Sequence, residues 1–267
     1  MDKLEAILRE LNLYPQWRLR NPPEPKQGNP LSAEAEVELT QTVATEQPLP
    51  IAAMEDAVVP ISLDSSLEPA QFLGVNARGE LNDLGWPELK KQVHDCTACK
   101  LRAGCTQTVF GVGDEKADWM FVGEGPGADE DALGDPFVGE AGKLLDNMLT
   151  AIKLKRGKNV YITNVVKCHP PGNRAPETDE IAACLPYLQR QIELIKPRLI
   201  VALGKVASNA LLGKDATIAS LRGTLHDYHG IPLIVTYHPA YLLRSPSEKA
   251  KAWQDLCLAV NTRAADA

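Results

Sequence analysis

The sequence predicts an α/β protein: a three-layer α/β/α sandwich with a central four-stranded parallel sheet, preceded by a disordered acidic amino-terminal tail. Two observations lead to this prediction. In the last two-thirds of the chain, short apolar runs that suit buried parallel strands alternate with amphipathic stretches that suit helices. Residues 21–70 instead hold eight prolines, nine acidic residues and no aromatic residue, a composition that buries too little apolar surface to fold.

The expected strands and helices alternate along the chain. Four apolar runs are predicted to form the strands, at residues 119–122, 160–166, 199–203 and 233–237. Helices are expected between them, at residues 142–152, 177–195 and 205–212. Strands separated by helices pair in parallel, so their carboxyl ends meet at one edge of the sheet, where open α/β proteins bind their ligands.

The first quarter of the chain is expected to differ from this domain. The sequence divides into a short amphipathic helix at residues 1–20, a disordered Pro-rich acidic linker at 21–75 and the α/β domain at 76–267. The apolar face of the helix consists of Leu4, Ile7, Leu8 and Leu11. This helix either docks on a protein partner or folds back on the main domain.

The distribution of charge leaves a nucleic-acid partner open. The net charge is −7, but residues 1–95 hold 8 Lys and Arg against 16 Asp and Glu, whereas residues 96–267 hold 20 against 19. The predicted domain is therefore nearly neutral and can approach a polyanion. The chain starts with acidic residues rather than a secretory signal, and no apolar stretch is long enough to span a bilayer. We expect a cytoplasmic monomer without membrane contact.

Cysteines in a reducing compartment indicate metal ligation or burial rather than disulfides. The six are Cys96, Cys99, Cys105, Cys168, Cys184 and Cys257. The first two form a Cys-x2-Cys turn and, with Cys168 and Cys184, supply four thiolates, a count that suits Zn²⁺ and an iron-sulfur cluster equally. For Cys168 and Cys184, the alternative is burial as small apolar side chains. For Cys105 and Cys257, burial is the favoured interpretation.

Chemically active side chains lie in or just after three of the four predicted strands. Gly123-Glu124-Gly125-Pro126-Gly127 follows the first strand, Asn164 lies in the second, and His238-Pro239-Ala240-Tyr241 follows the fourth. The glycine-rich turn lacks the ending of a P-loop and the spacing of a dinucleotide-binding loop. It can still present a carboxylate and several backbone N–H groups to a small planar ligand or to water. Phe137 is interpreted either as a core side chain or as a surface on which a base stacks.

Taken together and in this order, the motifs closely resemble those of the iron-sulfur uracil-DNA glycosylases, often called family four. The resemblance covers about residues 90–260 and leaves the amino-terminal ninety residues out. The segments that carry it are Cys96-x2-Cys99, Gly123-Glu124-Gly125-Pro126-Gly127, Pro136-Phe137-Val138-Gly139, Tyr161-Ile162-Thr163-Asn164-Val165-Val166-Lys167-Cys168, Asn173-Arg174-Ala175-Pro176 and His238-Pro239-Ala240-Tyr241-Leu242-Leu243-Arg244.

The resemblance implies a DNA repair glycosylase that flips uracil out of DNA and hydrolyses its N-glycosidic bond, leaving an abasic site. It implies a structural [4Fe-4S] cluster held by Cys96, Cys99, Cys168 and Cys184. It also implies a uracil pocket formed by Glu124, Gly125, Pro126, Phe137, Asn164 and His238. The substrate is then uracil-containing DNA, single-stranded or double-stranded, and the enzyme is associated with the nucleoid when it acts.

Physical chemistry suggests roles for the polar members of this pocket. The amide of Asn164 can accept from uracil N3–H and donate to O4, whereas cytosine reverses both contacts, so Asn164 is expected to select the base. His238 can donate to uracil O2 as negative charge develops on the departing base. Glu124 can either stabilise the cationic sugar or orient the attacking water, and the sequence leaves both roles open.

Extruding a base from a duplex also requires phosphate contacts and an apolar wedge. Either Leu242 or Leu243 is expected to fill the gap left by the flipped base, unless both pack inside a helix. Arg244, Asn173 and Arg174 are expected to contact phosphate. The basic run at 153–158 is interpreted instead as a solvated connection at the opposite end of the sheet.

Two other interpretations are open. A related branch of the superfamily carries an Arg-rich insertion with a histidine that traps the sugar covalently, but the segment between Cys168 and Cys184 lacks such an insertion. The second is a non-catalytic nucleic-acid-binding module in which the four cysteines hold zinc.

Overall fold

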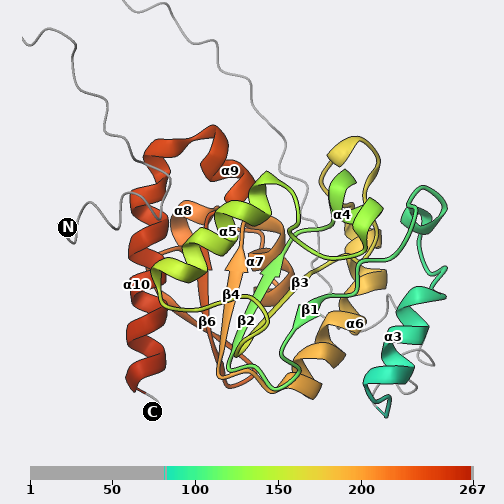
Figure 1. Ribbon diagram of the computed structural model, residues 1–267, viewed down its shortest axis with the longest axis horizontal. Helices are drawn as coiled ribbons and strands as arrows, with labels where there is room; N and C mark the ends of the chain where they lie inside the picture. The colour runs from blue at the N-terminus through green and yellow to red at the C-terminus, as the bar shows by residue number, and fades with distance from the viewer. Residues whose placement is uncertain (1–80, 82, 266–267) are drawn as a thin grey trace, which may run out of the picture. The chain divides into compact units, whose positions relative to one another are not determined.

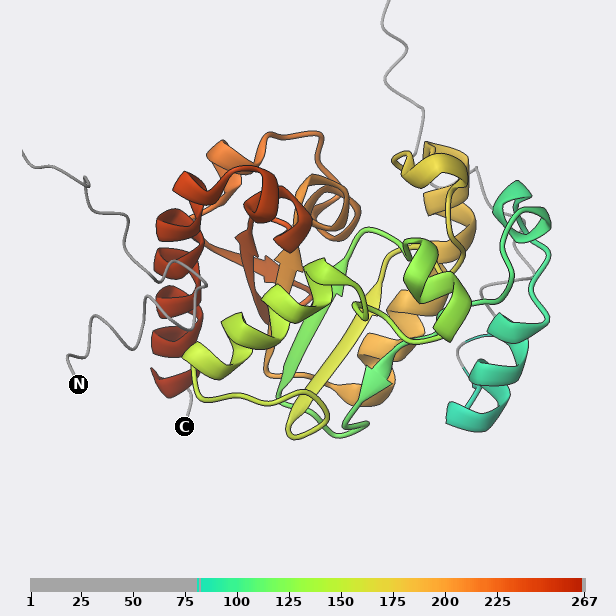
Figure 2. The same ribbon diagram turned by 45° about the horizontal axis from the view of Figure 1, so that its top comes forward.

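The computed structural model describes residue 81 and residues 83–265, which form an α/β fold around a six-stranded sheet (Figures 1 and 2). The predicted helix at 1–20 and the predicted linker at 21–75 lie outside the described residues. The strand order is β1-β3-β2-β4-β6-β5. The inner strands are β2 (Trp119–Gly123), β3 (Val160–Asn164), β4 (Leu199–Leu203) and β6 (Ile231–Thr236).

The four inner strands run parallel, as the sequence predicts. The expectation of only four strands is wrong, because a short antiparallel strand extends the sheet at each edge. These are β1 (Val112–Gly113), which pairs with β3, and β5 (Leu225–Tyr228), which pairs with β6. His229 and Gly230, with φ of +50° and +86°, form the two-residue turn between β5 and β6. Such turns usually begin with Asn, Asp or Gly, so His229 concealed the hairpin from a reading of the sequence.

Helices cover both faces of the sheet and complete the predicted three layers (Figure 2). One face carries α3 (Trp86–His94), α6 (Thr178–Ile195), α7 (Lys205–Leu212) and α8 (Ile218–Leu221), and the other carries α5 (Glu140–Ala151) and α10 (Lys249–Ala265). The shorter elements are α4 (Ala128–Leu133), α9 (Pro239–Arg244), η1 (Lys100–Ala103), η2 (Pro171–Asn173) and η3 (Pro246–Glu248). Within residues 83–265, no helix combines the length and the apolar character needed to cross a bilayer.

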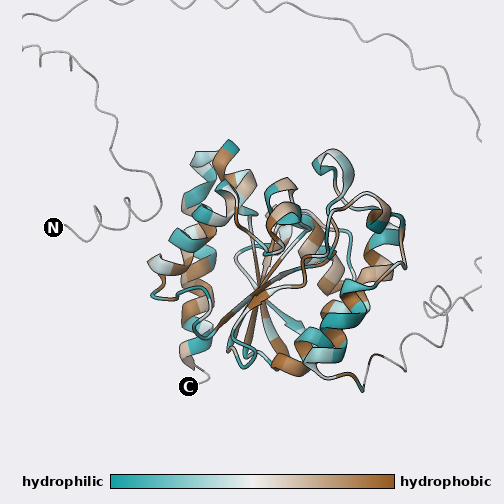
Figure 3. Ribbon diagram, turned by 45° about the vertical axis from the view of Figure 1, so that its right-hand side comes forward, coloured by the Kyte–Doolittle hydropathy of each residue, from teal (hydrophilic) through white to brown (hydrophobic). Residues whose placement is uncertain are grey.

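The strands β2, β3 and β4 are buried along their whole length, and their side chains alternate between two apolar cores. Figure 3 shows the strands of the sheet centre in the colour of hydrophobic residues. In β2, Met120 and Val122 belong to the core beneath α3, α6 and α7. Trp119 and Phe121 belong to the core beneath α5 and α10. Because both faces of these strands are covered, apolar residues occupy successive positions, which is the pattern that made the strands predictable.

The long helix α10 does not stand out in the apolar pattern of the sequence. Its buried stripe contains Leu256 and Ala259 but also Asp255, whose side chain is fully buried. The Asp255 carboxylate accepts hydrogen bonds from Arg222 and from the hydroxyl of Thr236, each at 2.9 Å. A buried carboxylate is tolerated only when such partners satisfy it, and these partners come from distant parts of the chain.

Candidate active site and metal centre

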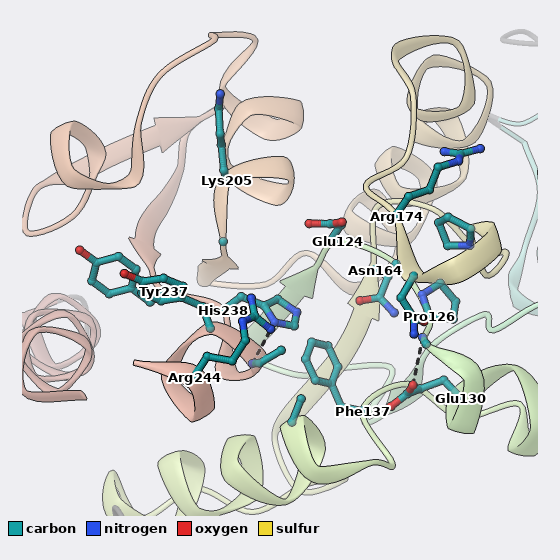
Figure 4. A pocket seen from close by; sticks show the side chains of 18 of the residues that line it. Glu124, Pro126, Glu130, Phe137, Asn164, Arg174, Lys205, Tyr237, His238 and Arg244 are labelled. Carbon is teal, nitrogen blue, oxygen red and sulfur yellow. Dashed lines mark hydrogen bonds between the residues drawn. The ribbon is translucent and has the colours of Figure 1, made fainter. Parts of the chain in front are cut away.

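A cavity of about 590 Å³ opens at the carboxyl edge of the sheet, where the turns after β2, β3, β4 and β6 meet (Figure 4). Its wall contains every predicted base-contacting residue and three of the predicted DNA-contacting residues. These are Glu124, Gly125, Pro126, Phe137, Asn164, Asn173, Arg174, His238 and Arg244. The fold therefore gathers side chains from segments that lie far apart in the sequence, at the edge where open parallel sheets bind ligands.

Asn164 is the last residue of β3 and pairs with Gly123 of β2. It is 1% exposed, and its side-chain oxygen Oδ1 has no hydrogen-bond partner among the described residues. A Cβ atom at Gly123 would lie 2.4 Å from that oxygen, so glycine is required for the close approach. Because a buried acceptor without a partner costs free energy, the oxygen marks a position where a ligand donor would be favourable.

Phe137 adopts an unusual backbone conformation beside Asn164, with φ of +56°. Its ring lies against the His238 ring, with centroids 5.4 Å apart and an interplanar angle of 29° (Figure 4). The backbone carbonyl of Phe137 lies close to α5 because residue 142 is a glycine: a Cβ at Gly142 would lie 1.8 Å from the Phe137 oxygen. Arg156 donates to the carbonyls of Pro136 and Phe137 at 2.8 Å each. The interpretation of the whole basic run at 153–158 as a solvated connection is therefore wrong for Arg156, which supports the pocket.

Glu130 is a functional residue that the sequence reading missed. It lines the cavity, and its carboxylate accepts hydrogen bonds from the backbone N–H groups of Gly127, Val138 and Gly139 at 3.0, 2.9 and 3.2 Å. These contacts join the glycine-rich turn after β2 to the loop that carries Phe137. Glu130 stands three residues after Gly127, the N-cap of α4, and this capping-box spacing could have revealed it.

His238 is the N-cap residue of α9, and its Nδ1 accepts from the backbone N–H of Ala240 at 3.2 Å. Burial lowers the pKa of its imidazole to about 4, and the nearby Arg244 cation acts in the same direction. The ring is therefore neutral at pH 7. Since Nδ1 is an acceptor, the single ring proton is on Nε2, which makes that atom a hydrogen-bond donor.

Glu124 follows β2 directly, and its half-buried side chain lines the cavity near His238 (Figure 4). Burial raises the pKa of its carboxyl group. The group nevertheless shares the cavity with the cationic side chains of Lys205 and Arg244. A carboxylate in such a site can stabilise positive charge on a bound ligand or accept a hydrogen bond from water.

The predicted DNA-contacting residues occupy different environments. Leu242 is 1% exposed and packs in the core between α5 and α10, whereas Leu243 is 39% exposed. Of the two leucines, Leu243 is therefore the one that can reach a duplex. Arg174 donates to both carboxylate oxygens of the buried Glu180, at 2.8 and 2.7 Å, so a phosphate contact would have to compete with this ion pair. Asn173 is exposed at the rim of the cavity.

The four predicted metal-ligating cysteines line a second, smaller cavity. Its lining includes residues of α3, α6 and the segment after β3, with Cys96, Cys99, Cys168 and Cys184. Cys257 lies on α10 and does not line this cavity, and neither does Cys105, whose thiol lies next to that of Cys168. The backbone N–H of Lys167 donates to the sulfur of Cys184 at 3.2 Å.

Burial raises the pKa of the Cys184 thiol to about 12, and it also raises those of Cys99 and Cys168. Buried sulfur atoms of this kind become thiolates only when a positive centre is bound beside them, and a metal ion or cluster supplies that charge. Within residues 83–265, no three His, Cys, Asp or Glu side chains are grouped closely enough to hold a single metal ion.

Lys167 connects the two cavities and was not singled out from the sequence. Its ammonium group is buried and donates to Thr163 Oγ1 at 2.6 Å, to the backbone oxygen of Asn164 at 2.8 Å and to Gln191 Oε1 at 2.7 Å. Three acceptors match the three donors of an ammonium group. The residue that contacts Cys184 through its backbone thus holds the Asn164 backbone through its side chain.

Residues 110–257 match the family model for the uracil DNA glycosylase superfamily. The chain is 42% identical to a type-4 uracil-DNA glycosylase of Pyrobaculum aerophilum over 179 residues, which is 64% of this chain and 91% of that protein. It is 46% identical to a type-4 uracil-DNA glycosylase of Thermotoga maritima over 165 residues, covering 61% of this chain and 85% of the relative. A type-5 uracil-DNA glycosylase of Pyrobaculum aerophilum is 34% identical over 148 residues, 49% of this chain and 64% of its own.

Proposed function

Because the chain belongs to the uracil-DNA glycosylase superfamily and, within it, to the type-4 uracil-DNA glycosylases, we propose that the cavity at the carboxyl edge of its sheet binds uracil flipped out of DNA. The protein is a DNA repair enzyme, a hydrolase that removes uracil by breaking its N-glycosidic bond. This sets aside the alternative of a non-catalytic module. The observation that carries the proposal for the site is the buried, unpaired oxygen of Asn164 facing that cavity.

The base is proposed to lie on the Phe137 ring with its Watson–Crick edge toward Asn164. The unpaired Asn164 oxygen would accept from uracil N3–H, and the side-chain nitrogen would donate to O4. Cytosine carries an acceptor at N3 and an amino group at C4, so it would leave both groups of the buried amide unpaired. Leaving the groups of a buried amide unpaired is costly, and this supports strong discrimination against cytosine.

In the reaction, the C1′–N1 bond breaks, its electron pair leaves with the base, and water adds to C1′ and loses a proton. Negative charge therefore develops on uracil while positive charge develops on the sugar. The neutral His238 ring would donate from Nε2 to uracil O2, where the charge accumulates. Its low pKa means that the ring is neutral at pH 7 and acts on the anion as a hydrogen-bond donor rather than as a cation.

DNA binding is proposed to use the rim of the same cavity. Arg244 would contact phosphate beside the flipped nucleotide, with Asn173 and Arg174 on the opposite rim. The exposed Leu243 would enter the gap that the base leaves in the stack. For Arg174, this role requires that the guanidinium partly release Glu180.

The overall proposal is tested with the purified full-length protein and short oligonucleotides that differ only in one base. Alkali-dependent strand cleavage is expected with a uracil-containing strand and not with the matching cytosine-containing strand. Cleavage of both strands to the same extent would refute the base-reading role of the pocket. Cleavage of neither would refute the assignment of this reaction to the cavity.

The four thiols around the smaller cavity support a [4Fe-4S] cluster, held by Cys96, Cys99, Cys168 and Cys184. The fit is supported by the number of thiols that line one cavity and by the Lys167 backbone N–H, which donates to the Cys184 sulfur. A cluster there would join the segment after α3 to β3 and α6. Its proposed role is structural, since it would cross-link segments that are separated by about seventy residues of sequence.

Cys184→Ala should abolish bound iron and lower the melting temperature, because it removes a ligand that ties α6 to the other three. Cys257→Ala is the matched control on α10 and should keep full iron. Iron content and absorbance near 400 nm measure both variants. Cys105→Ala is the critical case, since its thiol neighbours Cys168: loss of iron in that variant would mean that Cys105 is a ligand and that the proposed set is wrong.

The pH dependence of excision should show an acid limb that belongs to Glu124. Burial raises the pKa of this carboxyl, so lowering the pH protonates it before an ordinary carboxyl and removes its negative charge. If the charge is needed, the single-turnover rate falls as the pH drops through this raised pKa. Glu124→Gln should then be slow at every pH and lack the limb.

The size of the Glu124→Gln effect also separates the two roles of this residue. Loss of about a hundredfold, as for removal of a charge that stabilises a transition state, would favour electrostatic stabilisation of the sugar cation. A loss of only a few-fold would favour orientation of water, because the glutamine oxygen can still accept a hydrogen bond. The same acid limb in wild type and variant would show that another group controls it.

A further inference from the structure

The cavity is larger than one pyrimidine base requires. Its volume of about 590 Å³ suits a ligand the size of a nucleotide or a small drug. The uracil-reading residues Asn164 and Phe137 occupy one side of it, and Lys205 and Tyr237 lie on the other side of His238 and Glu124 (Figure 4). Tyr241, whose ring stacks on that of Tyr237, and Arg244 also line this second side (Figure 4). The chemistry of uracil excision described above uses only Arg244 among them.

The second side contains a stack of flat side chains. The rings of Tyr237 and Tyr241 are stacked, with centroids 5.1 Å apart and an interplanar angle of 26°. The guanidinium carbon of Arg222 lies 5.9 Å from the centroid of the Tyr237 ring. Tyr241 is the last member of the stack and is 37% exposed. An exposed aromatic ring at the end of a stack is a surface on which a further flat group can lie.

The stack rests on a rigid base. Arg222 donates to both oxygens of the buried Asp255 carboxylate, at 3.2 and 2.9 Å, and to the backbone oxygen of Lys251 at 2.7 Å. The hydroxyl of Tyr237 is hydrogen-bonded to Glu248. These contacts fix the first two layers before any ligand arrives. A ligand that stacks on Tyr241 therefore pays little for ordering the protein, which favours affinity.

Two cations line the same cavity as this ring. Lys205 is the first residue of α7, separated from β4 by Gly204, and Arg244 ends α9, three residues after Tyr241. Lys205 pairs with Asp215 at 3.0 Å, but both side chains are largely exposed, so this ion pair is weak and can be exchanged for a phosphate. A cavity lined by both an exposed aromatic ring and cations has the combination of groups that binds single-stranded nucleic acid.

We propose that this second side is a subsite for the nucleotide next to the flipped uracil, whose base stacks on Tyr241 while Lys205 binds a flanking phosphate. The inference rests on the proposed function, since it places a neighbour beside a uracil bound at Asn164. A base can lie on Tyr241 only after it leaves its own stack. The subsite therefore favours single-stranded or locally opened DNA over an intact duplex.

The stacking contact is tested by a cycle that pairs a protein change with a substrate change. Single-stranded oligonucleotides carry uracil with either an intact neighbour or a tetrahydrofuran abasic residue in its place, on the 5′ or the 3′ side. For wild type, removing the base on one of the two sides should lower kcat/KM by roughly tenfold, the usual order for one base–aromatic stack. With the intact substrate, Tyr241→Leu should have a kcat/KM that is lower than that of wild type by the same factor. Removing the neighbouring base should not lower the kcat/KM of this variant any further.

Tyr241→Phe keeps the ring and should regain the dependence on the neighbouring base, whereas a merely structural role of Tyr241 would lower the rates of all substrates equally. The subsite would be overturned if removing the neighbouring base lowered kcat/KM by the same factor in Tyr241→Leu as in wild type. It would also be overturned if removing that base left the kcat/KM of wild type unchanged on both sides. Neither result would touch the proposed function, because wild type would still excise uracil in every arm. Absence of wild-type excision would instead overturn the proposed function itself.

The phosphate contact has its own measurement. Lys205→Gln should reduce the dependence of log Kd on log salt concentration by about one unit of slope for a single strand that contains uracil. Lys153→Gln is the matched control, since Lys153 follows α5 at the opposite end of the sheet and should leave the slope unchanged. An unchanged slope in Lys205→Gln would remove Lys205 from the subsite.

Discussion

His238→Ala should lower the rate of uracil excision by about a hundredfold or more while affinity for uncleaved DNA stays nearly the same. The structure gives the reason. The imidazole is neutral because burial lowers its pKa to about 4, and its Nδ1 is occupied by the Ala240 N–H, so Nε2–H is free to donate. That donor contributes most when the base carries negative charge, which happens in the transition state and much less in the bound substrate.

The measurement is single-turnover excision, with binding of an uncleavable uracil analogue in DNA measured separately. His238→Gln is an informative companion, because its side-chain amide can donate in a similar place, and it should recover part of the loss. Since His238 also caps α9 and packs on Phe137, the melting temperatures of both variants should be compared with wild type. Normal excision by a folded His238→Ala protein would contradict this mechanism.

Asn164→Ala should lower the rate of uracil excision to a comparable extent. Unlike His238→Ala, it should also reduce the selectivity for uracil over cytosine. The variant loses the acceptor for uracil N3–H, so it should excise uracil far more slowly. Removing the amide also removes the groups that cytosine would leave unpaired, and the ratio of uracil to cytosine excision should fall. The ratio is measured on two strands that differ only at this base.

Asn164→Asp sharpens the same experiment. A carboxylate can accept from the cytosine amino group, but it repels the departing anionic base, so any gain of cytosine excision should be faint. Inhibition by free uracil gives a second reading of base recognition that does not depend on chemistry at the sugar. If Asn164→Ala excises uracil normally and binds free uracil as wild type does, then another residue reads the base.

The sequence revealed the parts of the site that follow directly from strand order. Asn164 lies in one predicted strand, which the structure ends at this residue rather than at 166, and His238 follows another; parallel strands carry such residues to a common edge. The same reasoning placed Glu124 after β2. Helix α9 has only six residues, which is too few for the apolar pattern to show which of its two leucines is buried. The packing of Leu242 against α5 and α10 decides this.

The supports of the site were hidden for physical reasons. Arg156 belongs to a basic run, and such runs are usually solvated, yet its side chain reaches back to the loop before α5. Lys167 is fully buried, which is rare for lysine, and only three converging acceptors make that position tolerable. The carbonyls that Arg156 binds lie about twenty residues earlier, and Lys167 needs Gln191 from α6 in addition to its neighbours Thr163 and Asn164, so the local sequence does not reveal either role.

The backbone conformation of Phe137 has a consequence for redesign of the enzyme toward larger bases. A non-glycine residue at φ of +56° costs roughly 1–2 kcal/mol, and Arg156 and Gly142 hold it there. Replacing the Phe137 ring by a smaller side chain would enlarge the pocket, but the backbone of residue 137 would stay in the same place. Admitting a purine would also require this backbone to move, which means changing Gly142 and Arg156 together with Phe137.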